Sequence, residues 1–184
     1  MRFIRKTVRL ALTISLALSA FSCGEMAESA GEATDAGKPG TPSLDPMFET
    51  PEALTRAILK AFETEDGEAL RSYALTKEQF RLYVWSKLPS SRPERGVPFE
   101  YGWGDLHEKS HNALLRNFAR FKGRKLELLG LRFEDGVTDY GTYKVHRDAR
   151  VQVRTEGGEK RWLDLFGSVM EWQGKYKLFS YVTD

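Results

Sequence analysis

The stretch that decides the fold is Thr50–Tyr73, "TPEALTRAILKAFETEDGEALRSY". Its first three residues are a capping threonine, a proline at the first helical position and a glutamate in the first turn, all preferred at a helix start. Leu54, Ile58 and Phe62 follow at helical spacing, which gives this helix one apolar face. Asp66-Gly67 then ends it and begins a shorter helix. The stretch predicts two consecutive short helices.

The next part of the chain continues as helix and loop. Residues 76–79, "TKEQ", resemble a capping box and predict a third helix that ends before Pro89. Residues 89–104 are rich in proline, glycine and serine, which predicts a long loop able to carry binding groups. A fourth helix is expected from Asp105 to about Lys122, where Gly123 ends it.

After this helix the apolar period changes from helical spacing to two, which is typical of strands. The four segments with this pattern are Lys125–Phe133, Gly141–Thr155, Arg161–Trp172 and Tyr176–Thr183. The turn signals between them are Asp135-Gly136, Gly157-Gly158 and Gln173-Gly174. Gly130 and Gly167 interrupt strands, where a bulge or sharp bend is expected. The sequence therefore predicts an α+β fold, with N-terminal helices packed on a curved antiparallel sheet of about four strands.

This order of elements, the opening phrase at Thr50–Tyr73 and the closing strand "GKYKLFSYV" at 174–182 resemble the NTF2-like, or cystatin-like, α+β cone. The resemblance covers roughly residues 50–184. It implies a conical sheet with helices over its mouth, enclosing a pocket. The family includes isomerases, dehydratases, transport adaptors and binding domains, so the resemblance selects no single function.

The first 23 residues, "MRFIRKTVRLALTISLALSAFSC", combine a basic start with the apolar run Leu10–Ala20. This run is too short to span a bilayer, which favours a secretory signal over an anchor. Ser19–Cys23 resembles the lipobox of bacterial lipoproteins. The resemblance implies cleavage before Cys23, lipidation of this cysteine and, with Gly24 next, sorting to the outer membrane facing the periplasm in a cell with two membranes. The alternative is an ordinary signal peptide with an incidental cysteine.

Three regions follow from this interpretation: a lipoprotein signal peptide at 1–22, a tether at 23–46 and one domain at 47–184. The tether is small, polar and acidic, a composition that cannot bury enough apolar surface to fold. The full chain has a net charge of +2, but the signal holds four basic and no acidic residues. Its removal leaves 24 basic against 26 acidic residues, which argues against a nucleic-acid partner.

His107-Glu-x-x-His111 matches the motif by which zinc peptidases hold their metal and activate a water. A catalytic zinc needs a third protein ligand, and the downstream sequence contains no continuation of the peptidase motif. Asp105 and Glu108 are instead spaced as the two acids of a capping box. Because both histidines lie on the apolar stripe of the expected helix, we expect them to face inward without metal.

Phe99, Tyr101 and Trp103 precede these histidines and are candidates, with His107 and His111, to line a cleft. We expect a membrane-anchored extracytoplasmic domain without catalytic activity or cofactor, which binds a small molecule, peptide or envelope partner. The alternative is an enzyme: either an isomerase or hydro-lyase acting in the cone, or a zinc metallopeptidase with His107 and His111 as ligands. No catalytic residue is assigned.

Two weaker candidates for acid–base chemistry are Asp164 and Tyr143, whose side chains could face into the cone. His146 alternates with Tyr143 and Val145 on an expected strand. It is interpreted as a surface or edge residue rather than a metal ligand.

Overall fold

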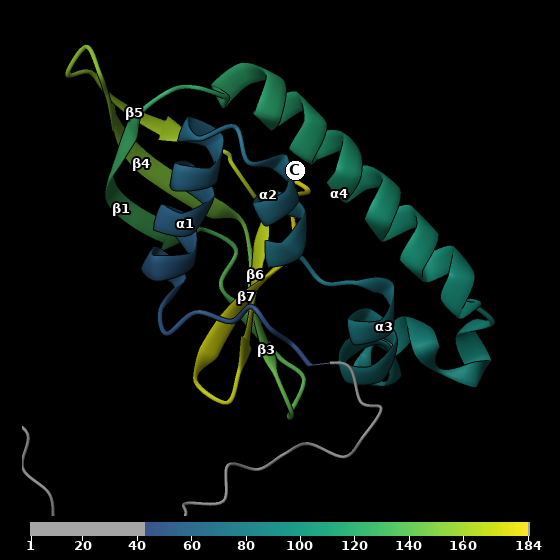
Figure 1. Ribbon diagram of the computed structural model, residues 1–184. Coiled ribbons are helices and arrows are strands. Elements are labelled where there is room, and N and C mark those ends of the chain that lie inside the picture. The colour runs from purple at the N-terminus through teal and green to yellow at the C-terminus, as the bar shows by residue number, and fades with distance from the viewer. Residues whose placement is uncertain (1–42, 184) are drawn as a thin grey trace, which may run out of the picture. The chain divides into compact units, whose positions relative to one another are not determined.

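Four α-helices precede seven β-strands in residues 43–183, the part of the chain that the structure, a computed structural model, describes (Figure 1). The helices are α1 (Pro51–Glu63), α2 (Gly67–Tyr73), α3 (Lys77–Gln79) and α4 (Phe99–Phe121). Shorter turns join α3 to α4: a π-helical turn, η1 (Phe80–Val84), and the 3-10 turns η2 (Trp85–Lys87), η3 (Pro89–Ser91) and η4 (Pro93–Arg95). The strands are β1 (Leu126–Phe133), β2 (Val137–Asp139), β3 (Lys144–His146), β4 (Ala149–Thr155), β5 (Lys160–Leu163), β6 (Ser168–Trp172) and β7 (Lys175–Ser180). The predicted α+β class is confirmed.

The helix starts predicted from side-chain caps are confirmed. Thr50 Oγ1 accepts a hydrogen bond from the Ala53 amide at 3.0 Å, and Asp66 caps α2 in the same way. The capping box at the start of α3 is complete, because the side chains of Thr76 and Gln79 each accept from the other's backbone amide. Each cap satisfies an amide that the helix itself leaves without a partner.

The start of α4 differs from the prediction. The helix begins at Phe99, six residues before the expected Asp105, so residues 99–104 are helical and not loop. Gly102 and Gly104 lie inside the helix. Gly102 is needed for packing, since a β-carbon there would lie 2.5 Å from the ring of Trp85. Gly102 therefore allows a close contact between this helix and a neighbouring turn.

The four predicted strand segments form two antiparallel sheets, ordered β1-β4-β5 and β2-β3-β6-β7. Two of the four segments are divided by a bend, because 141–155 contains β3 and β4 and 161–172 contains β5 and β6; β2 lies outside the predicted segments and follows β1 across the same bend. Backbone hydrogen bonds continue through the bend, such as Glu134 N to Asp148 O at 2.9 Å and Ala149 N to Gly167 O at 2.9 Å. The meander is therefore curved, and the bend lies where the chain passes from one sheet to the other.

Two details of the predicted strands were tested by the structure. Both glycine irregularities are confirmed: the β1–β4 register shifts between Leu128 and Gly130, and Gly167 lies at the bend beside a shift at Ser168. The first turn was misplaced. The chain reverses between β2 and β3 around Gly141, whose φ is +83°, while the predicted turn Asp135-Gly136 lies at the bend.

Two apolar clusters occupy the two sides of this bent meander. The first joins α1, α2 and the C-terminal half of α4 to the sheet, and its centre includes Phe62, Val151 and Leu178. The second joins η1 to β3 and β6 through Phe80, Val145 and Met170, with the N-terminal half of α4 at its edge. In Figure 1, α4 runs as one long helix alongside the other elements. Only Ala113, Leu114 and Phe121 of its residues are buried.

The N-terminal end of the domain lies slightly earlier than predicted. The signal peptide (1–22), Cys23 and most of the tether (23–46) are outside the described residues. Residues 43–46, assigned to the tether, belong to the domain: Leu44 is only 7% exposed and packs in the second cluster. Gln79 Nε2 also donates to Ser43 O at 2.6 Å. A single leucine between serine and aspartate gave no periodic signal from which this packing could be predicted.

None of the helices formed by residues 43–183 has the length and apolarity that crossing a bilayer would require.

Candidate functional site

A cleft of about 390 Å³ lies between α4 and residues 71–77, with the end of β7 at its base. Its volume falls within the range of roughly 300–1,000 Å³ that small-molecule sites occupy. The lining residues are Arg71, Ala74, Leu75, Thr76, Lys77, Trp103, Leu106, His107, Ser110, His111, Leu114, Phe179 and Tyr181. They come from separate stretches of the chain, which the fold brings together.

The base of the cleft is apolar, and its polar groups already have partners. Leu114 and Tyr181 are buried there, beside the partly buried Leu106 and Phe179. The Tyr181 hydroxyl donates to Leu70 O at 2.7 Å, and the Tyr181 amide donates to Ser110 Oγ at 3.0 Å. Burial raises the pKa of this tyrosine above its ordinary value, so it stays neutral. The base therefore offers contact area and no free acid or base.

The rim of the cleft is polar and carries positive charge. Arg71 and Lys77 contribute two cations, and His107 and His111 add two imidazoles; no aspartate or glutamate lines the cleft. Lys77 Nζ pairs with Glu100 at 2.7 Å, and Arg81 holds the same carboxylate at 2.9 Å. The hydrogen bond from Lys77 lowers the pKa of Glu100, which keeps it ionised.

The five residues predicted to line one cleft lie in three different places in the structure. Trp103, His107 and His111 line the cleft described above. Tyr101 is exposed and lines a different cavity of about 410 Å³, next to η2 and η3. Phe99 lines neither: its ring packs 6.2 Å from that of Phe80, measured between ring centroids, inside the second apolar cluster.

The expected environment of the two histidines was wrong. His107 and His111 are exposed on the middle of α4, although they share its apolar stripe. The reason is that the side of α4 that packs on the rest of the domain carries Ser110, Ala113 and Leu114, and the two histidines lie beside it, where the cleft opens. The two imidazole rings are stacked, with their centroids 6.0 Å apart, and the ring centroid of Trp103 lies 5.2 Å from that of His107.

The capping box predicted for Asp105 and Glu108 is also wrong, because both residues lie within α4 rather than at its start. Asp105 instead pairs with Lys109, one turn along, at 2.8 Å. Residues 43–183 contain no group of three His, Cys, Asp or Glu side chains placed to bind a metal ion. Within this part of the chain, His107 and His111 therefore lack the third protein ligand that a catalytic zinc requires.

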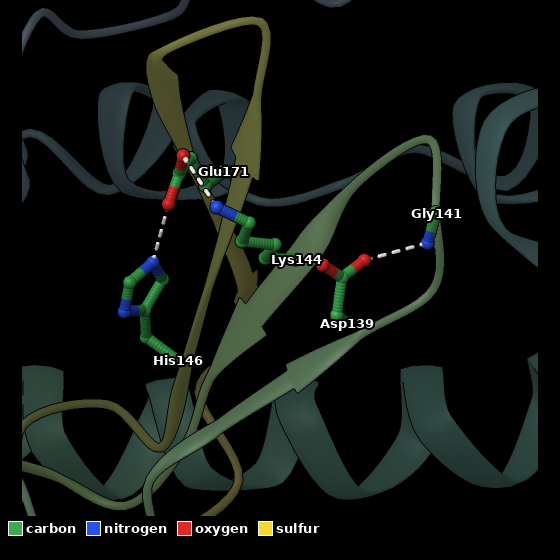
Figure 2. A network of polar contacts seen from close by, with 5 residues as sticks. All are labelled: Asp139, Gly141, Lys144, His146 and Glu171. Carbon is green, nitrogen blue, oxygen red and sulfur yellow. Dashed lines mark hydrogen bonds and ion pairs between the residues drawn. The ribbon is translucent and has the colours of Figure 1, made fainter.

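The structure places His146 differently from the predicted surface or edge position. It lies on β3, between β2 and β6, with its side chain 17% exposed. Figure 2 shows Glu171 reaching both His146, at 2.8 Å, and Lys144, where the distance is 3.7 Å. In the same view, Asp139 accepts from the Gly141 amide at the β2–β3 turn. Glu171 links the two neighbouring strands β3 and β6 through these contacts, and neither it nor His146 lines the cleft along α4.

The two residues considered for acid–base chemistry do not meet. Tyr143 is buried against Val84 O, which its hydroxyl approaches at 3.4 Å, and burial raises its pKa. Asp164 is about half exposed and pairs with Arg150 at 2.8 Å. Neither residue lines the cleft along α4.

Two cleft residues, Arg71 and Lys77, were not predicted as site residues. Both sit in the short helices α2 and α3, where exposed basic residues usually face solvent. They lie far from the histidines in the sequence, so no local pattern connects them. Only the return of α4 across α2 and α3 brings these charges beside His107 and His111.

Comparisons with protein-family models, with curated proteins and with solved structures found no match to this chain. The fold and the cleft define an α+β domain that has a cleft of small-molecule size along α4.

Proposed function

We propose that this chain is a lipid-anchored protein of the bacterial cell envelope whose NTF2-like domain binds a small molecule in the cleft along α4. The observation that carries the proposal is the composition of this cleft. An apolar base combines with a few convergent polar groups at the rim, which is the usual composition of a small-molecule site. The charge balance of the chain after signal removal gives no support to a nucleic-acid partner.

The same cleft supports binding in preference to catalysis. Acid–base enzymes hold a carboxylate, histidine or tyrosine with a partner that adjusts its proton affinity. The residues that line the cleft include no carboxylate to pair with the two histidines. The hydroxyl of the cleft tyrosine, Tyr181, donates its hydrogen bond to a backbone carbonyl. The isomerase, hydro-lyase and zinc-peptidase alternatives therefore have no assembled site within residues 43–183.

Anchoring predicts that Cys23→Ser releases the protein from membranes. Without the thiol there is no attachment site for lipid, and the described helices supply no spanning segment. Fractionation of cells into membrane and soluble protein measures the effect. Ser22→Ala is the matched control, because it keeps a small residue before the cysteine and should leave the protein on the membrane. An unchanged membrane fraction for Cys23→Ser would contradict lipid anchoring at this residue.

Binding in the cleft predicts a local response to a neutral amphipathic probe, 4-phenylbutyramide. Its aromatic body matches the apolar base, so titration should shift the indole N–H resonance of Trp103 in a saturable way. Trp162 lies on β5 outside the cleft and provides the internal control. The measurement is an NMR titration of the full lipidated chain in lipid nanodiscs. Equal shifts at both tryptophans, or none at Trp103, would count against a ligand site here.

A further inference from the structure

We propose that the ligand of the cleft along α4 is a small amphipathic carboxylate, with its apolar body on the cleft base and its carboxylate held by Arg71. This inference rests on the proposed binding function and adds the chemical class of the ligand. It depends on the distribution of charge around the rim, on the position of the Arg71 guanidinium and on the apolar base.

The charge around the cleft selects against cations. Arg71, Lys77 and the two histidines line it, and no acidic side chain does. A cationic ligand would be desolvated beside these groups without a counter-charge, which is unfavourable. An anion meets charges of the opposite sign and available N–H donors.

Arg71 is the cation available to such an anion. Lys77 already pairs with Glu100, which is shared with Arg81, so its charge is largely compensated within the protein. Arg71, by contrast, makes no ion pair with any residue between 43 and 183. Binding an anion there therefore requires no internal ion pair to break.

The position of Arg71 places the anion at one end of the cleft. Its Nη1 lies 3.6 Å from the point that a β-carbon on Gly67 would occupy, and the ring of Phe118 lies 3.8 Å from the same point. The guanidinium thus neighbours the part of α4 that follows Leu114, beyond His111. From this end, Leu114, Leu106 and Trp103 contribute apolar side chains along α4, and Ser110, which lies between the two leucines, is occupied by the Tyr181 amide.

A carboxylate with an uncharged apolar body suits this arrangement. The planar guanidinium can donate two parallel hydrogen bonds to a carboxylate, a geometry that lysine cannot provide. The remaining lining residues are mostly apolar, so the rest of the ligand is expected to be uncharged. One charged head and one apolar body account for both parts of the cleft.

The test compares 4-phenylbutyrate with its neutral amide and its amine analogue, 4-phenylbutylamine, by titration of the Trp103 indole resonance. The full lipidated chain in lipid nanodiscs is used throughout. We expect the carboxylate to bind about tenfold more tightly than the amide, and the amine more weakly than either. Arg71→Gln should reduce the ratio of carboxylate affinity to amide affinity from about tenfold to about one. Arg116→Gln is the matched control, since Arg116 is exposed on α4 outside the cleft and also lacks an ion pair within the described residues.

The outcomes separate this inference from the binding function on which it rests. Equal affinity for carboxylate and amide, or a preference that survives Arg71→Gln, would overturn the carboxylate assignment and leave the cleft as a site for neutral ligands. If none of the three probes shifts Trp103, both proposals fail. Unfolding midpoints of the two variants that match the wild type exclude a loss of fold as the cause.

Discussion

Replacing Gly167 with alanine should destabilise the domain by about 3 kcal/mol, at the upper end of what overpacking costs. A β-carbon at this position would lie 1.6 Å from Val182 O and 2.8 Å from the carbonyl carbon of the same residue. Because these are backbone atoms, no side-chain rotation can relieve the clash. The chain at Val182 is held in place by its neighbour Tyr181, whose hydroxyl and amide are both hydrogen-bonded.

Chemical denaturation of the wild type and Gly167→Ala measures this effect as a difference in unfolding free energy. Gly104→Ala is the matched control. Gly104 lies inside α4, and nothing lies within 4 Å of the point that a β-carbon there would occupy. Alanine at this position should therefore stabilise the protein by about 0.5–1 kcal/mol. A Gly167→Ala protein as stable as the wild type would mean that the bend at β6 is not fixed by the C-terminal chain.

The stability of the domain should rise by about 2 kcal/mol between pH 8 and pH 10 because of one residue, Lys177. Its side chain is fully buried on β7, and its ammonium donates to Ser72 O at 3.1 Å and to Pro46 O at 3.3 Å. Desolvation lowers its pKa from the ordinary 10.5 to about 8, against a smaller opposing effect of Asp45. Between these two pKa values the unfolded chain binds more protons than the folded one, so stability increases with pH.

Lys177→Met is the variant that isolates this effect, since methionine has a similar length and no charge. Its stability should change little between pH 8 and pH 10. Above pH 10 the stability of both proteins should fall, because burial raises the pKa of Tyr143 and Tyr181 and the unfolded state then loses protons first. Urea denaturation at intervals of half a pH unit measures both. An equal rise in the two proteins would assign it to other groups.

The parts of the fold predicted from sequence are those specified by local rules. The caps at Thr50 and Asp66 and the period-two segments depend on neighbouring residues alone, and the structure confirms them. The start of α4 was missed because Gly102 is determined by a tertiary contact with Trp85. A sequence pattern cannot distinguish a glycine that ends a helix from one that admits a neighbouring ring.

The candidate site was predicted only in part for a related reason. The helical spacing placed His107 and His111 on one stripe, and both line the cleft together with Trp103. Whether that stripe is buried or faces an opening depends on how α4 is turned against α2 and β7, which no residue of α4 alone determines. Arg71 belongs to α2, and its position beside α4 is a result of the tertiary fold.

The attachment of residues 43–48 to the domain has a mechanical consequence. This entry segment is held by Gln79 at Ser43, by Lys177 at Pro46 and by a pair of backbone hydrogen bonds, 2.7 and 2.8 Å long, between Phe48 and Tyr176. Tension on the chain before residue 43 would therefore be transmitted to β7 and to the end of α3 before it reached α1. Both elements also line the cleft, through Lys77 of α3 and Phe179 of β7, so a pulling force would act on one wall of the ligand site.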